Sequence, residues 1–257
     1  MSSNTLNSKR LLALVGTHMT SEGKDKPETG PSHVLHLLRD AYIDLVPTLP
    51  AQCRKHDTSV IHEVLGRDAY RLLHLRQTGK TYDVLVDVGS NIGTVTSAAL
   101  ALGIVKSADC FEINPDSAAA QRRVYDLAHF PFFNVVRQHV GHASPAAVCD
   151  VLEGHISAGR TILLKMDVEG WEYPILQEME VRGQFRHIAD MVMELHDPKG
   201  QACLDPDGRR KLIKDTIDSI ERTSCWKLCL LTNFESTMYL LLTVSSYGTT
   251  KPVFPAE

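Results

Sequence analysis

Hydrophobic and polar positions change period at about residue 80. Before it, apolar residues recur every three or four positions, as in Val34, Leu38 and Tyr42, which predicts helices, the first of which ends at Pro47. After it, short apolar runs alternate with helical patterns. This alternation predicts an α/β fold with a mostly parallel sheet and helices on both faces. The expected strands span residues 83–89, 108–114, 133–140, 161–168 and 188–196.

The chain is expected to end in a hairpin. Two apolar segments, 226–233 and 237–244, are separated by a short polar break, so they are expected to pair antiparallel. The polar stretch before the first helix has the composition of a flexible arm. The predicted organisation is a flexible N-terminal arm over 1–30, a helical lead-in packed on the core over 31–80 and a sheet domain over 81–257.

Composition is that of a soluble globular protein, because 43% of the residues are apolar, 23% are charged and the net charge is −4. No basic block argues for nucleic acid as the main partner. No apolar run approaches the ~20 residues that a membrane span requires, so no membrane partner is expected. The six cysteines form no CxxC pair, which favours idle thiols in a reducing compartment, and the expected location is cytoplasmic.

The sequence VDVGSNIG, residues 86–93, joins a predicted strand to a predicted helix through two glycines. A dinucleotide fingerprint needs glycine at the first, third and sixth positions of this turn, but these positions are Gly89, Asn91 and Thr94. A diphosphate ligand is therefore not expected. Gly89 still permits a tight turn and Gly93 a close approach of the helix, while the Asn91 amide both donates and accepts hydrogen bonds. The turn alone also fits plain helix packing.

An acid follows at the end of the next strand. Glu112, in FEINP, lies nineteen residues after Gly93, close to the ~20-residue offset of a carboxylate that binds ribose hydroxyls. A glycine turn without a diphosphate site, paired with this acid, suits a ligand that has an amino-acid end and a nucleoside end. The ligand that this combination suggests is S-adenosylmethionine.

Four stretches, in this order and spacing, carry a resemblance to a known family: VDVGSNIG, FEINP, LLKMDVEGWEYPIL and MVMELH. With them the chain resembles the FkbM-type family of S-adenosylmethionine-dependent methyltransferases over roughly residues 83–245. The resemblance implies the Rossmann-like seven-stranded class I methyltransferase sheet with a terminal antiparallel strand, which makes 81–257 the methyltransferase domain. It also implies methyl transfer to an oxygen of a sugar, polyketide or similar small molecule.

The donor site is expected to use residues at the ends of the first four strands. Where many methyltransferases place an acid near the adenine, this chain has His142, which either hydrogen-bonds the adenine or lies in a surface loop. The expected donor-binding residues are Asp87, Gly89, Ser90, Asn91, Gly93, Glu112, Ile113, His142 and Asp167.

Polar residues also leave the ends of two later strands. Residues two apart in a strand point to one face, so Asp167 and Glu169 are expected on one side, and Glu194 and His196 likewise. These strands are neighbours in a sheet of this type, so the four side chains are expected around one opening. His196 is the natural base for a hydroxyl nucleophile, and Glu194 or Glu169 could orient it. The prediction is a metal-free catalytic site; the alternatives are Mg²⁺ or Mn²⁺ on the same side chains, and helix capping without chemistry.

Three residues near this cluster have other expected roles. Lys165 is expected to be the buried partner of an acid. Trp171 is expected to pack the loop against the core, with a lid over the substrate as the alternative. Glu172 stands in the first turn of the following helix, where capping and catalysis are both open.

The predicted function is therefore methylation of a hydroxyl on a small molecule, with S-adenosylmethionine as the cofactor. No nucleic-acid or membrane partner is expected. The alternative is a non-catalytic binding or scaffold protein on a methyltransferase fold, because a fold does not imply an activity.

Overall fold

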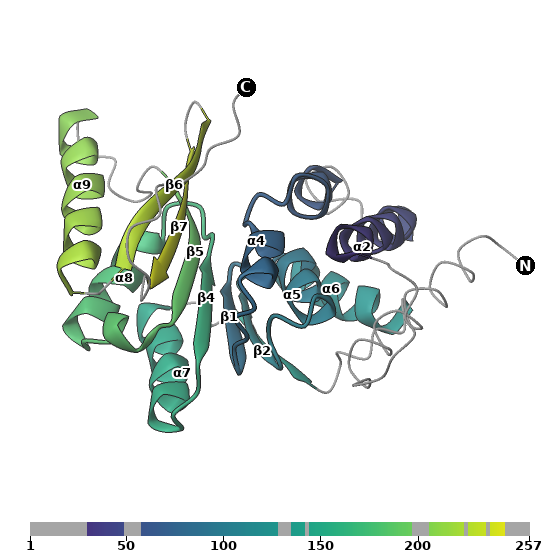
Figure 1. The fold of residues 1–257 in the computed structure, drawn as a ribbon, viewed down its shortest axis with the longest axis horizontal. Helices are drawn as coiled ribbons and strands as arrows, with labels where there is room; N and C mark the ends of the chain where they lie inside the picture. Colours follow the sequence, from purple (N-terminus) through teal and green to yellow (C-terminus); the bar gives the residue numbers. More distant parts are fainter. Residues whose placement is uncertain are drawn as a thin grey trace, which may run out of the picture. The chain divides into compact units, whose positions relative to one another are not determined.

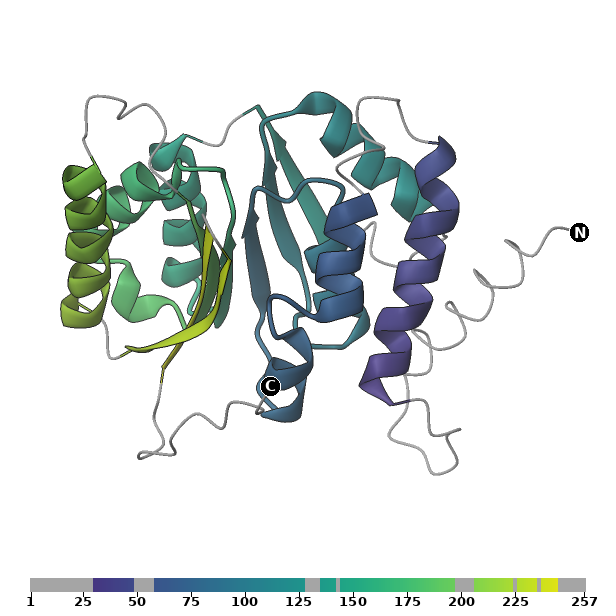
Figure 2. The same ribbon diagram turned by 90° about the horizontal axis from the view of Figure 1, so that it is seen from above.

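The computed structural model describes residues 30–48, 58–127, 135–141, 144–196, 206–223, 226–234 and 237–244. These residues form two compact units, unit 1 within Met1–Ala143 and unit 2 within Ser144–Glu257. Figures 1 and 2 show the helices and strands of each. Residues 1–29 of the predicted arm and His142 of the predicted donor site lie outside the described residues.

Unit 1 contains a parallel sheet of three described strands in the order β3-β2-β1. The strand β1 is buried along its whole length, which is typical of a parallel strand covered on both faces. Two helices, α5 and α6, lie along one face of these strands in both views (Figures 1 and 2). The bounds are β1 Val84–Val88, α5 Thr94–Ala101, β2 Ala108–Glu112, α6 Pro115–Leu127 and β3 Val136–Val140.

The described part of the lead-in is helical. The helix that was expected to end at Pro47 is α2, which ends at Leu45 and continues as a short 3-10 helix through that proline. It packs against α5, all of whose residues are buried. The described helices here are α2 Pro31–Leu45, the 3-10 helix Val46–Thr48, the π-helix His62–Gly66 and α4 Leu72–Gln77.

One hydroxyl connects this lead-in to the glycine turn. Tyr42 of α2 is fully buried, and its hydroxyl lies 3.3 Å from the carbonyl oxygen of Ile92 and 3.0 Å from that of Gly93. It also lies 2.7 Å from the hydroxyl of Ser97 on α5. Burial raises the pKa of the Tyr42 phenol far above its ordinary value, so the proton that bonds these oxygens is retained. The lead-in thus supports the glycine turn through the hydroxyl of Tyr42.

Unit 2 contains four described strands in the order β4-β5-β7-β6. The strands β4 and β5 are parallel, and β7 runs antiparallel to both β5 and β6. The helices α7, α8 and α9 lie along one face of these strands in both views (Figures 1 and 2). The bounds are α7 Pro145–Ser157, β4 Ile162–Met166, α8 Glu172–Val181, β5 Asp190–Leu195, α9 Pro206–Thr223, β6 Trp226–Phe234 and β7 Thr237–Val244, with a 3-10 helix at Phe185–His187.

The prediction of an α/β fold with parallel strands is confirmed, since β1 to β5 pair in parallel within their units. The strands are shorter than their apolar runs. The run 108–114 ends as a strand at Glu112, because the backbone N–H of Asn114 turns back to donate to Glu112 Oε1 at 2.7 Å, and α6 begins at the next residue. Among the described helices, none combines the length and the apolar composition needed to cross a membrane.

Replacing Tyr42 by Phe tests the link between the lead-in and the glycine turn. The ring keeps its apolar packing, but the buried oxygens of Ile92, Gly93 and Ser97 lose a hydrogen-bond partner. We expect the free energy of unfolding to fall by about 1–3 kcal/mol in urea titrations. An unchanged midpoint would show that the hydroxyl contributes nothing to the turn.

Candidate functional site

The turn after β1 has an unusual backbone. Gly89, Asn91 and Gly93 all have a positive φ, at 81°, 48° and 81°. Glycine adopts this region without a steric penalty, and asparagine is among the few other residues that enter it readily. The backbone N–H groups of Gly89 and Ser90 both donate to the carbonyl oxygen of Phe111 at 2.9 Å, which fastens the turn to β2. The residue types of this turn therefore follow from its backbone.

Gly93 also has a packing role. A Cβ atom at this position would lie 2.5 Å from Nε2 of Gln121, a fully buried side chain of α6. Gln121 is held in place because it donates to the hydroxyl of Tyr125 at 2.9 Å and accepts from Gln138 at 2.9 Å. The start of α5 and the glycine turn can approach α6 only because residue 93 has no side chain.

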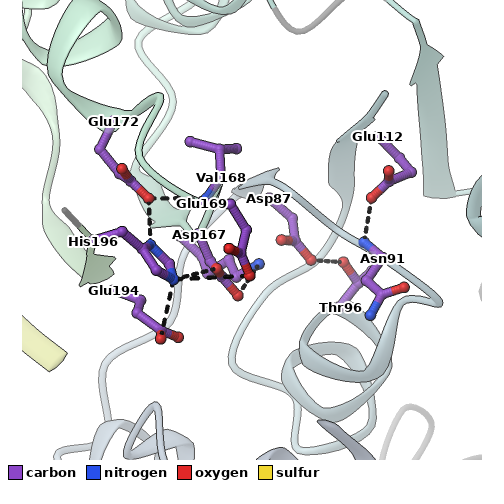
Figure 3. Close-up of polar contacts among 11 residues, drawn as sticks. Asp87, Asn91, Thr96, Glu112, Asp167, Val168, Glu169, Glu172, Glu194 and His196 are labelled. Carbon is purple, nitrogen blue, oxygen red and sulfur yellow. Dashed lines mark hydrogen bonds and ion pairs between the residues drawn. The ribbon is translucent and has the colours of Figure 1, made fainter. Parts of the chain in front are cut away.

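Glu112 faces the glycine turn, as the sequence predicts (Figure 3). Its Oε2 accepts a hydrogen bond of 2.8 Å from the backbone N–H of Asn91, and its Oε1 accepts the bond from Asn114. The side chain is half-buried, so solvent reaches the carboxylate. Each carboxylate oxygen can accept a second hydrogen bond, which leaves capacity for a ligand hydroxyl.

The other predicted donor residues of unit 1 differ in their exposure. Asp87 is fully buried and accepts a 2.6 Å hydrogen bond from the hydroxyl of Thr96, so it lies inside the unit below the turn (Figure 3). Ser90 is 3% exposed, and its hydroxyl has no hydrogen-bond partner among the described residues. Ile113, directly after Glu112, is 73% exposed, which is unusual for a large apolar side chain.

A second group of polar residues lies in unit 2, where β4 and β5 end. Asp167 and Glu169 follow β4, Glu194 and His196 stand at the end of β5, and the two strands are neighbours in register, as predicted. A fifth member, Glu172, comes from the first turn of α8. We call these five residues the acid–imidazole cluster.

The His196 ring lies at the centre of this cluster (Figure 3). Its Nδ1 is 2.8 Å from Oε1 of Glu172, and its Nε2 is 3.2 Å from Oε1 of Glu194. The carboxylates of Asp167 and Glu169 each lie 4.0 Å from the same Nε2. Three of the predicted side chains therefore gather around the fourth, His196, within unit 2.

Glu169 lies close to the expected position, but the strand alternation from which this position was predicted is wrong. Strand alternation does not apply to it, because β4 ends at Met166 and Glu169 has a left-handed backbone with φ of 58°. The turn formed with Gly170 brings its carboxylate back toward His196. At 70% side-chain exposure it is far more accessible than Glu194, whose side chain is 13% exposed.

Neighbouring carboxylates control the charge of His196. Burial opposes the charged ring, but the hydrogen bonds and negative charge of Glu172 and Glu194 outweigh it and raise the pKa of His196 to about 10. The ring therefore carries a proton on each nitrogen at neutral pH. In this form it donates hydrogen bonds and cannot accept a proton.

Glu172 is the member of the cluster whose role the sequence left open. It is fully buried, and its Oε1 accepts from both His196 and the backbone N–H of Val168, the latter at 3.1 Å. It thus fixes the imidazole and the end of β4 together. An acid in the first turn of a predicted helix, preceded by two other acids in DVEGWE, was the signal available in the sequence.

The structure confirms the prediction for Lys165 and contradicts the one for Trp171. Lys165 is 2% exposed and its ammonium lies 3.7 Å from Asp167, so the predicted buried partner of an acid is confirmed. Trp171 is 58% exposed, so the prediction that it packs against the core is wrong. It instead lines a cavity of about 460 Å³ between α8 and α9.

Comparison with known proteins finds chains of similar fold but no close relative. No protein-family profile and no curated protein matches the chain. Among solved structures, a proposed O-methyltransferase from Klebsiella pneumoniae is 16% identical, with a TM-score of 0.50 over 92% of this chain and 98% of that one. An O-methyltransferase from Bacillus cereus, solved in complex with SAH, is 14% identical, with a TM-score of 0.49 over 92% and 99% of the two chains.

At such identity the likeness to the Klebsiella protein shows the fold alone. The chain has an α/β Rossmann-like fold of the kind seen in that protein. The resemblance to the FkbM-type family, which none of these comparisons shows, stays a prediction.

Alanine at Gly93 tests the close approach of the turn to α6. It would suffer the left-handed backbone, at about 1–2 kcal/mol, and the collision with Gln121, at about 1–3 kcal/mol more. Gly79→Ala is the matched control, because Gly79 has a similar φ of 71° with no atom within 4 Å of the added Cβ. Urea unfolding of both variants is expected to show the larger loss at Gly93. Equal losses would contradict the packing role.

The charge of His196 predicts a pH dependence of stability. Folding raises the pKa of this group from 6.5 to about 10, so its stabilising effect is fully present below pH 6.5 and is lost as the pH rises toward 10. We expect the stability difference between the wild type and His196→Gln, measured by urea unfolding, to shrink across this range. A difference that stays constant with pH would show that the ring is uncharged in the folded protein.

Proposed function

We propose that this chain is an S-adenosylmethionine-dependent methyltransferase that methylates a hydroxyl group of a small molecule. The observation that carries the proposal is the carboxylate of Glu112 at the glycine turn, 2.8 Å from the backbone N–H of Asn91. An acid at this offset, beside a turn that lacks the glycines of a diphosphate site, suits a nucleoside attached to an amino acid. The fold of the chain is compatible with this function.

The residues of unit 1 fit the parts of S-adenosylmethionine. Glu112 would accept hydrogen bonds from the ribose hydroxyls, and the exposed apolar side chain of Ile113 would cover one face of the adenine. The hydroxyl of Ser90, which lacks a partner among the described residues, would bond the amino-acid end. Asp87 would act indirectly, since it supports the turn through Thr96. His142 and Asp167 remain proposed donor contacts.

When bound, S-adenosylmethionine supplies a methyl group on a positively charged sulfur, which keeps the electron pair of the broken bond. The chain must hold the acceptor hydroxyl and take its proton. His196 holds its own proton until about pH 10, so we assign proton acceptance to a carboxylate. Glu169 is the most accessible carboxylate of those facing Nε2, and His196 would position it.

A carboxylate alone is a weak base for this task. A phenol-like hydroxyl has a pKa of ~10 and a free glutamate ~4.3, so the transfer is uphill by roughly 8 kcal/mol before any stabilisation of the oxygen anion. Positive charge near the acceptor oxygen is therefore needed. The imidazolium of His196 supplies one such charge within the acid–imidazole cluster.

A second candidate is a binding protein without catalysis. The observation in its favour is that both oxygens of Glu112 already accept backbone N–H groups, which is a structural role complete in itself. Formation of S-adenosylhomocysteine with any acceptor, over a panel of sugars, phenols and other hydroxyl compounds, would exclude this candidate.

Calorimetry tests the donor site. We expect the wild type to bind S-adenosylmethionine and S-adenosylhomocysteine, and Glu112→Gln to bind both about 10- to 100-fold more weakly, as for a lost hydrogen bond to a charged group. Glu178→Gln, at a surface ion pair with Arg182, is the control and is expected to bind as the wild type does.

A second measurement separates two roles of Glu112: binding of the ribose hydroxyls and support of the glycine turn. An S-adenosylhomocysteine analogue without the 2′ and 3′ hydroxyls is expected to lose affinity for the wild type but little further affinity for Glu112→Gln. Equal losses in both proteins would remove Glu112 as the ribose ligand. Absence of any binding to the wild type at saturating concentrations would remove the donor site as a whole.

A further inference from the structure

We propose that the acid–imidazole cluster of unit 2 binds one divalent cation, Mg²⁺ or Mn²⁺, through Asp167, Glu194 and His196. The binding itself depends only on unit 2, whereas its use in catalysis rests on the function proposed above. The cation would replace the proton on Nε2 of His196 as the positive charge near the acceptor oxygen.

The spacing of the ligand atoms suits a shared cation. One oxygen of Asp167, one oxygen of Glu194 and one nitrogen of His196 all lie within 4.8 Å of one another. Bonds of ~2.1 Å to a shared cation place neighbouring ligand atoms ~3 Å apart, so small side-chain rotations bring the three into a coordination sphere. The Nε2 to Glu194 distance is 3.2 Å and already has this value.

The orientation of the His196 ring is typical of a metal-binding histidine. Its Nδ1 is bonded by Glu172, which leaves Nε2 as the nitrogen that faces Asp167 and Glu194 (Figure 3). Histidines that bind metals are almost always oriented in this manner by a carboxylate or carbonyl on the second nitrogen. A cation would take the place of the proton that Nε2 shares with Glu194.

Glu172 is the buried partner of one of the three ligands. The side chain is fully buried at 0% exposure, it points toward the His196 ring, and its Oε2 has no hydrogen-bond partner among the described residues. A buried carboxylate oxygen without a partner is expensive to retain in a purely structural site. A cation on Nε2 would strengthen the hydrogen bond that the ring donates from Nδ1 to Oε1 of Glu172.

Negative charge gathers at this point of unit 2. The cluster brings four carboxylates together, with His196 and Lys165 in contact with them. The ammonium of Lys165 lies 3.7 Å from Asp167. A divalent ion bound by both Asp167 and Glu194 would lower the mutual repulsion of their carboxylates.

The ligand types select the class of cation. Carboxylate oxygens with one imidazole suit Mg²⁺ and Mn²⁺, and the absence of thiolates from the three ligands disfavours zinc of the structural kind. Three protein ligands leave positions for water or for an oxygen of the acceptor. A cation at this place would stabilise negative charge on the acceptor oxygen as its proton passes to Glu169.

Titration of the full chain with Mn²⁺, followed by electron paramagnetic resonance of the free ion, tests the site without S-adenosylmethionine. We expect one saturable ion per chain, displaced by Mg²⁺. Asp167→Asn and Glu194→Gln, which keep the side-chain shapes, are expected to lose saturable binding. Glu172→Gln is expected to weaken it about 10- to 100-fold, as for other outer partners of a metal-bound histidine. Asp215→Asn, an exposed acid paired with Lys211, is the control and should bind as the wild type does.

The wild type alone can overturn the proposal, because absence of saturable Mn²⁺ binding removes the site whatever the variants do. Binding that survives unchanged in both Asp167→Asn and Glu194→Gln also overturns it, since the ion would then lie elsewhere. Mn²⁺ binding without S-adenosylmethionine binding would support the cation site and contradict the proposed function. The reverse result would retain the donor site and remove the cation.

Discussion

The hydrogen bond from the backbone N–H of Asn91 to Glu112 joins the turn after β1 to the end of β2. It requires an asparagine or glycine backbone at residue 91, an acid at the last position of β2 and parallel pairing of the two strands. Tyr42 supports the same turn from α2, and Gln121 limits it from α6. The proposed donor site of unit 1 therefore depends on how one short turn is fastened on three sides.

In unit 2 the governing constraint is electrostatic. Four carboxylates cannot gather around one imidazole without a large charge penalty, and the structure meets this by keeping His196 protonated and Lys165 buried beside Asp167. A protonated His196 is a hydrogen-bond donor and a source of positive charge, whereas its residue type alone suggests a base. The neighbours of a histidine thus matter more than its position at the end of a strand.

Much of the fold could be predicted from the sequence, because strand and helix periods are local properties. The acid at Glu112 and the gathering of Asp167, Glu194 and His196 followed from parallel strands whose ends share an edge. Glu172 and Tyr42 could not be assigned, since their contacts join residues 24 and 51 positions apart whose facing depends on helix packing. The exposure of Trp171 could not be predicted either, because it depends on the turn before α8, where Glu169 and Gly170 both have a positive φ.

The left-handed backbone of Glu169 has a consequence for comparing this chain with related sequences. Glycine at position 169 would preserve the backbone at φ of 58° and relieve its strain, yet it would remove the carboxylate that faces His196. Natural variation there therefore distinguishes two selective pressures. Lineages that keep an acid despite the strain would retain it for its charge, whereas lineages that drift to glycine would need only the bend.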